Sequence, residues 1–284
     1  MAKAEKSPAR DGKAVAVVED AANLPAMNYD YGAYAGEGFE DMGRDDYATP
    51  FLYVLQPTSP ITTLDDNARP GMLMDSVSQE MWKAEKSKGA EHAGVAFIPC
   101  HRQHLFVEWK KRDEKGGGGG YVGQHEVGSA VVEAAKKKYD FGKLEQNGND
   151  LIETFYVYGL LIKPDGTWQP MVLPFTSTKI KAYKHWMTRL ANIKVNGQKP
   201  PLWAHRARIT TLRQENDKGV FYIMEIAFDG DNAIEARLDP TSEIFQEAAE
   251  FYRLCKDGVA KPDYTSPGAA EAAGGAVVDA EIPF

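Results

Sequence analysis

The sequence has very little cysteine. Cys100 and Cys255 are the two thiols among 284 residues, too few for the disulfide framework of a small secreted domain. Long hydrophobic runs are also missing, since no apolar stretch approaches the ~20 residues that cross a bilayer. The N-terminal segment lacks the apolar core of a secretory signal. These absences favour a protein of a reducing cytoplasm.

Motifs of catalysis and cofactor binding are missing as well. The five glycines of 116–120 are not followed by the lysine and hydroxyl residue of a phosphate loop, and are expected to form a flexible hairpin tip. The cysteine and histidines of 100–104 stand in a predicted strand that sends neighbours to opposite faces, and no second cluster completes a zinc site. Asp65 and Asp66 fall in a predicted turn, where solvation is the simpler role. The sequence predicts no enzyme, no metal and no cofactor.

Charge is unevenly distributed along this acidic chain. The formal net charge is −8 and the isoelectric point about 5.4. Residues 1–46 carry five basic and ten acidic side chains, and residues 258–284 carry one basic and four acidic ones. The remainder, 47–257, is neutral. Because both ends lack a sustained apolar period, we expect a single domain over 47–257 between a flexible acidic N-terminal arm and a disordered Gly/Ala-rich acidic tail.

Within the neutral part, residues 176–218 are strongly positive. Ten Lys or Arg stand there against Glu215 and Asp217, a net charge of +8. Tyr183, Trp186 and Trp203 are interleaved with these cations. Cations that follow phosphates, with flat rings on which bases stack, are what a single-stranded nucleic-acid groove requires. The other interpretation is a solvated helix and a strand whose rings face the core.

The hydrophobic periods predict a β-rich α+β domain. Two β-rich runs flank the turn sequence Pro-Asp-Gly-Thr of 164–167 and predict a hairpin. A second hairpin is expected over 202–228. Helices are expected at 129–142, 177–192 and from about 239 to 256, and the best strand of the first half lies within 94–112.

The expected faces of the positive stretch separate some of its residues. On the helix, Tyr183 falls on the apolar face and Trp186 near the boundary. On the following strand, Arg206 and Arg208 share one face and Trp203 lies on the other. In this register Trp203 faces away from the two arginines.

The last six residues, Asp279-Ala280-Glu281-Ile282-Pro283-Phe284, resemble the C-terminal tip of bacterial single-stranded DNA-binding proteins. That tip is an acidic stretch closing in Ile-Pro-Phe on a Gly-rich tail. The resemblance implies that the Phe284 ring and its carboxylate enter an apolar pocket rimmed by cations, while the acids add steering charge. This tip has two acids, Asp279 and Glu281, where bacterial members usually have more. The residues expected to bind a protein partner are Asp279, Glu281, Ile282, Pro283 and Phe284.

The body is similar to the larger single-stranded DNA-binding proteins of bacteriophages. The segments DDYATPFLYVLQPTSP and HLFVEWKKRDEKGGG carry this likeness. It implies an OB-like barrel with helical insertions, a role in coating and protecting single-stranded DNA during replication or recombination, and recruitment of replication proteins through the tip. It also implies the cytoplasm of a host cell and leaves a homo-oligomer open.

The groove predicted from these observations combines phosphate-binding cations with three stacking rings. Its members are Trp109, Lys110, Lys111, Arg112, Lys179, Lys181, Lys184, Trp186, Arg189, Trp203, Arg206 and Arg208. Two alternatives stay open: a phage interaction or virion protein whose positive region docks protein, and a replication nuclease with metal carboxylates at Asp65 and Asp66.

Overall fold

In the computed structural model, the described residues are 37–38, 48–86, 93–111, 120–138, 144–217, 219–266 and 268–269. The chain divides into two units, Met1–Asp41 and Met42–Phe284. All helices and strands of the described residues lie in the second unit. Apart from residues 37–38, the predicted N-terminal arm lies outside the described residues, as do the glycine run up to Gly119, Arg112 and the C-terminal tip.

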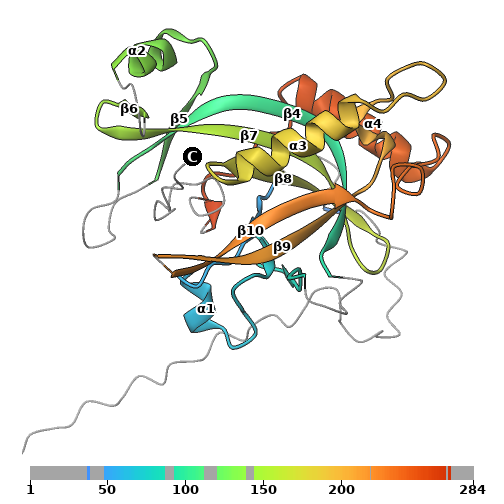
Figure 1. The fold of residues 1–284 in the computed structure, drawn as a ribbon, viewed down its shortest axis with the longest axis horizontal. Coiled ribbons are helices and arrows are strands. Elements are labelled where there is room, and N and C mark those ends of the chain that lie inside the picture. Colours follow the sequence, from blue (N-terminus) through green and yellow to red (C-terminus); the bar gives the residue numbers. More distant parts are fainter. Residues whose placement is uncertain are drawn as a thin grey trace, which may run out of the picture. The chain divides into compact units, whose positions relative to one another are not determined.

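Antiparallel strands dominate the second unit (Figure 1). Seven strands form the larger sheet: β4 (Val95–Trp109), β5 (Tyr121–Glu126), β6 (Leu144–Gln146), β7 (Asn149–Ile162), β8 (Trp168–Thr176), β9 (Ala207–Asn216) and β10 (Gly219–Phe228). Three short strands form the smaller sheet: β1 (Leu52–Val54), β2 (Leu73–Asp75) and β3 (Met81–Trp82). The helices of the described residues are α1 (Ile61–Leu64), α2 (Ala130–Lys138), α3 (Lys179–Ala191), α4 (Glu243–Lys256) and the 3-10 helix η3 (Leu202–Ala204). The predicted β-rich α+β class is confirmed.

The two predicted hairpins are present because their turn residues allow them. β7 and β8 pair from Thr154 opposite Thr176 to Ile162 opposite Trp168. Asp165 accepts a hydrogen bond from the Thr167 amide at 2.9 Å, and Gly166 has a φ of +86°. Asp side chains close turns in this way, and glycine adopts positive φ without steric cost. β9 and β10 form the second hairpin, with Gly219 opposite Asn216.

The strand expected from residue 202 begins later than the alternation suggested. Leu202–Ala204 form η3, and β9 starts at Ala207. Pro200 and Pro201 precede this segment, and Pro201 is extended, with φ −63° and ψ 161°. Proline lacks the amide that a ladder needs, so pairing starts only after the chain has passed the 3-10 turn. Trp203 therefore lies on the connecting 3-10 helix η3 and not on strand β9.

An OB barrel is not confirmed. The larger sheet runs in the order β10-β9-β4-β7-β6, with β5 on β4 and β8 on β7, and it does not close. Isolated bridges join it to the smaller sheet, Phe51 with Val172 and Glu85 with Thr211. Single bridges differ from the continuous ladders with constant stagger that define a barrel.

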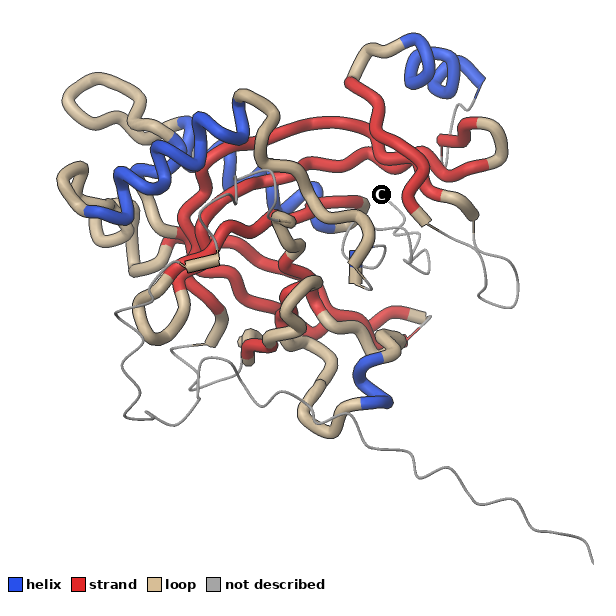
Figure 2. Tube along the Cα trace, turned by 180° about the vertical axis from the view of Figure 1, so that it is seen from behind, coloured by secondary structure: helices blue, strands red, loops and turns tan. Residues whose placement is uncertain are grey.

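Two helices cover opposite faces of the larger sheet. Tyr183, Trp186 and Leu190 of α3 pack into one apolar core with Phe97, Phe175 and Ile209. Ala248, Phe251 and Cys255 of α4 pack into a second core with Leu105, Trp109 and Tyr156. Figure 2 shows α2 at the end of β4 and β7 that lies away from the β9–β10 hairpin. A third, small core of Phe106, Val132, Ala135 and Leu151 holds α2 there.

Residues beyond the predicted domain boundary at 257 also pack against the sheet. Tyr264 stacks on Tyr121 with ring centroids 3.9 Å apart and hydrogen-bonds the Tyr156 hydroxyl at 3.0 Å. Thr49 bridges Pro262, and Ala269 is fully buried. Burial of these side chains offsets the chain entropy lost in ordering a Gly/Pro-rich segment. Residues 259–266 and 268–269 therefore belong to the folded domain.

Candidate nucleic-acid interface

Helix α3 carries the densest row of the predicted cations. Lys181, Lys184 and Arg189 are exposed, Lys179 is half-buried, and the helix contains no acidic residue. The Lys184 ammonium lies 5.8 Å from the Phe155 ring centre, and the Arg189 guanidinium 5.0 Å from that of Phe228. Cations over ring faces keep their charge while their stems cover apolar surface. Within the described residues, Lys181, Lys184 and Arg189 form no ion pair with a carboxylate.

Arg206 and Arg208 lie on the same side, as expected, but they share a carboxylate. The Arg208 guanidinium is 2.6 Å from Asp229 Oδ1, and Arg206 Nε is 3.5 Å from Asp229 Oδ2. The Asp229 side chain is 12% exposed. Opposite charges this close cancel much of each other's field. The two arginines therefore offer less positive charge than the sequence suggested.

Lys110 and Lys111 stand apart from the other predicted cations. They follow β4 at the end that pairs with β5, whereas β9 pairs with Val95–Phe97 at the opposite end. Twelve residues separate Phe97 from Trp109, about 40 Å along a strand. Lys111 also forms an ion pair with Glu145. The structure does not bring these lysines together with Arg206 and Arg208.

Two of the three predicted stacking rings are in the core. Trp109 is 1% exposed, with Tyr121 and Tyr264 edge-on against it at 6.0 and 6.1 Å. Trp186 is 2% exposed. Helix α3 packs against both β8 and β10, so its buried face is wider than one row of side chains. A ring without an open face cannot stack a base. Neither Trp109 nor Trp186 presents an open ring face in this structure.

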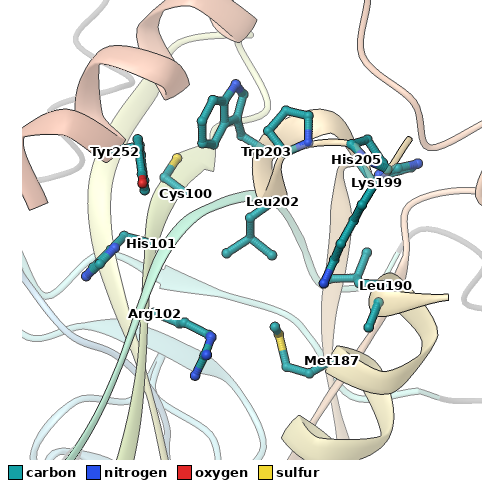
Figure 3. Close-up of a pocket in the computed structure, with 13 residues that line it drawn as sticks. Cys100, His101, Arg102, Met187, Leu190, Lys199, Leu202, Trp203, His205 and Tyr252 are labelled. Atoms are coloured by element: carbon teal, nitrogen blue, oxygen red, sulfur yellow. The ribbon is translucent and has the colours of Figure 1, made fainter. Parts of the chain in front are cut away.

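Trp203 is half-buried and lines a cavity of about 580 Å³. Its ring lies against Tyr252 of α4, with centroids 4.9 Å apart. Figure 3 shows Tyr252, Cys100, His101 and Arg102 along one side of this cavity, and Lys199 with Leu190 on the other. Lys199 and Arg102 are both exposed. We call this cavity the edge pocket; its full lining is Cys100, His101, Arg102, Met187, Leu190, Ala191, Lys199, Pro200, Pro201, Leu202, Trp203, His205 and Tyr252.

The histidines of the edge pocket contribute little charge near neutral pH. Burial lowers the pKa of His101, and the neighbouring Arg102 lowers it further. Burial likewise lowers the pKa of His205, with Arg237 adding to the effect. Desolvation and nearby positive charge both disfavour a protonated imidazole. Arg102 and Lys199 are therefore the charged groups of the pocket.

Sequence reasoning named Trp203 but not its neighbours in the edge pocket. Lys199 was counted in the positive stretch without being placed in the groove. His101 and Arg102 belong to the run 100–104, whose cysteine and histidines suggested only a possible metal site. Tyr252 lies in the final helix, far along the chain from the positive stretch. No local pattern signals that these side chains converge.

The alternative of a metal-dependent nuclease requires a cluster of metal-binding side chains. No group of three or more His, Cys, Asp and Glu side chains lies together in the described part of the chain. Asp65 instead closes its own turn, accepting a hydrogen bond from the Asn67 amide at 2.8 Å. Among the described helices, none combines the length and apolarity that crossing a bilayer requires.

The fold and the site together describe an antiparallel α+β domain with a cationic helix and a pocket of mixed cationic and apolar lining. Comparison with known families gives a match over residues 18–261 to the family described as Pam3 phage gp34-like protein. The chain belongs to this family, and a bacteriophage protein agrees with the resemblance inferred from its sequence. Neither the comparison with curated proteins nor that with solved structures found a match.

Proposed function

We propose that this protein binds single-stranded DNA in phage replication or recombination. The observation that carries the proposal is α3, where Lys181, Lys184 and Arg189 are exposed without a carboxylate partner among the described residues. A row of unneutralised cations on an otherwise acidic protein gives a local positive field, and local field governs association with a polyanion.

The proposed path of the strand runs along α3 toward the edge pocket at the end of the helix. Phosphates pair with the α3 cations. Arg206 and Arg208 contribute less, because Asp229 offsets part of their positive charge. Lys110 and Lys111 follow the end of β4 opposite to the one that pairs with β9, and this path does not include them. The acidic tip, residues 279–284, recruits replication proteins in this proposal, on the strength of its resemblance to bacterial tips.

The test is fluorescence anisotropy of labelled oligo(dT) beside a duplex of equal length, over a salt series. We expect preference for the single strand and a linear fall of log affinity with log salt. Lys181→Ala/Lys184→Ala should weaken binding and reduce the slope by about 1.4, since each phosphate contact on a single strand contributes about 0.7.

The matched control is Lys137→Ala/Lys138→Ala on α2, which removes the same charge from exposed positions outside the proposed path. Equal loss in both double variants would show a general charge effect and not a path along α3. Equal, weak binding of single strand and duplex by the unaltered protein would refute the proposed function and favour protein docking.

A further inference from the structure

β4 leaves part of one edge open. Along one edge it pairs with β7 over almost its whole length. Along the other edge it pairs with β9 through Val95–Phe97 and with β5 through Leu105–Trp109. Between these two ladders, residues 98–104 have no backbone partner on that edge in the described part of the chain. An unpaired strand edge presents amide donors and carbonyl acceptors that remain available to a ligand.

The edge pocket opens at this gap. Cys100, His101 and Arg102 of the open edge form one wall. A register shift between Pro99 and His101 makes Cys100 an extra, bulged residue. Bulges interrupt the alternation of faces and re-aim side chains. As a result His101 packs toward Tyr252 of α4, with ring centroids 6.0 Å apart, while Arg102 lies beside the Tyr183 hydroxyl of α3.

Segments from both faces of the sheet complete the edge pocket. Met187 and Leu190 come from α3, Tyr252 from α4, and Leu202 with Trp203 from η3. In Figure 3 the Lys199 side chain runs along the pocket, and its ammonium ends near Leu190. The volume of about 580 Å³ lies within the range of small-ligand sites.

The lining matches the chemistry of a nucleotide. It contains two cations, Arg102 and Lys199, and no Asp or Glu. Leu190, Leu202 and Met187 offer apolar contacts, with Trp203 and Tyr252 as aromatic walls. A flat base with polar edges and an attached phosphate uses all three features: apolar walls, free backbone groups and cations.

We infer that the edge pocket holds one nucleotide of the bound strand, its base against the apolar wall and its phosphate between Arg102 and Lys199. This inference rests on the proposed function and adds a site to it. An extended peptide could also pair with an open strand edge. The acid-free lining and the continuity of the pocket with the cationic helix favour the nucleotide.

The test fills the pocket without changing charge. Ala191 is exposed and lines the pocket at the end of α3, so Ala191→Leu adds bulk there and keeps a good helix former. We expect oligo(dT) affinity to fall about five- to a hundred-fold, the range that loss of one stacked base produces, with the salt slope unchanged. Ala134→Leu, at an exposed position of α2, is the matched control and should bind normally.

A second variant tests the phosphate contact. Lys199→Ala should weaken binding and lower the salt slope by about 0.7. Ultraviolet cross-linking of oligonucleotides containing 5-iodo-deoxyuridine, followed by mass spectrometry, should label Trp203 or Tyr252. Circular dichroism of each variant confirms folding, and if Ala191→Leu unfolds, Lys199→Ala and the cross-link decide.

The outcomes separate the two proposals. If the α3 double variant weakens binding while Ala191→Leu and Lys199→Ala bind like the unaltered protein, the strand bypasses the pocket and this inference is overturned alone. That result is also the one expected of a peptide-binding edge. If the unaltered protein binds no oligonucleotide, the proposed function fails and the inference fails with it.

Discussion

The Asp229 carboxylate lowers the positive field that Arg206 and Arg208 offer to a ligand. It accepts a hydrogen bond from Arg208 Nε at 2.8 Å and lies within ion-pair distance of Arg206. Asp229→Asn should lower the free energy of unfolding by about 1–3 kcal/mol, because a largely buried, hydrogen-bonded charge is lost. It should also strengthen oligo(dT) binding, since two arginines are released from their counter-charge. Urea unfolding and anisotropy measure the two effects.

The control for Asp229 is a carboxylate in a more exposed pair. Glu225 pairs with Lys86 at 2.7 Å, and the two side chains are 34% and 50% exposed. Exposed pairs contribute about 0–1 kcal/mol, so Glu225→Gln should change stability little. A cost for Asp229→Asn no larger than that of Glu225→Gln would show that Asp229 has no special structural role.

The two thiols should be unreactive in the folded protein. Burial raises the pKa of Cys255 to about 12, and it raises the pKa of Cys100 well above its ordinary value, with Cys255 adding to the shift. Thiolate is the reactive species. At pH 8, a disulfide reagent such as DTNB should therefore titrate almost no thiol before denaturant is added and two afterwards. Rapid labelling of the native protein would contradict this burial.

At the scale of elements, the path of β4 past β7 depends on Gly159. A Cβ at this position would lie 2.2 Å from the Ile98 carbonyl oxygen and 2.4 Å from the Phe97 ring. Backbone on one side and a core ring on the other cannot both move away. Gly159→Ala should therefore destabilise the protein by about 1–3 kcal/mol or more, measured by thermal unfolding.

Gly123 is the matched glycine for this comparison. It also lies in a strand of the larger sheet, β5, and an added Cβ there would meet nothing within 4 Å. Gly123→Ala should leave the melting temperature nearly unchanged. Similar losses in both variants would mean that the close approach of β7 to β4 is not what Gly159 provides.

Helix α3 shows how far periodicity alone can place side chains. Its limits, predicted as 177–192, are confirmed within two residues as Lys179–Ala191. The buried face of α3 was predicted less well. Trp186 was expected at the edge of the apolar face, and it lies in the core. A helical wheel assumes one covering surface, whereas α3 packs against both β8 and β10. The width of the buried face is set by the neighbours.

At the scale of the whole molecule, the acidic ends and the positive stretch suggest competition within one chain. Residues 270–284 carry three acidic side chains and no basic one. We predict that deleting 270–284 strengthens oligo(dT) binding at low salt, because a tethered polyanion no longer competes for the cations. The gain should vanish at high salt, where such interactions are screened.

A charge-matched variant accompanies this deletion. Asp279→Asn/Glu281→Gln keeps the length of the tail and removes two of its charges. It should reproduce part of the gain in affinity if charge is the cause. Unchanged affinity at low salt after deletion of 270–284 would show that the tail does not compete with DNA.

Local sequence patterns were enough to predict the two main hairpins, helix α3, the β-rich α+β class and the concentration of cations in 176–218. These depend on local quantities, namely the period of apolar residues, turn residues such as Asp165 and Gly166, and the count of charges. A short resemblance at the tip and along the body also gave the phage class. None of this requires knowing which distant segments meet.

Which residues can act together depends on how distant segments pack. The tertiary structure placed Trp109 and Trp186 in the core, joined Arg206 and Arg208 to Asp229, put Lys110 and the β9 pairing at opposite ends of β4, and gave an open sheet instead of a closed barrel. It also brought Arg102 and Lys199 to one pocket. Burial, ion pairing and strand order are properties of contacts between segments far apart in the chain, and no local pattern encodes them.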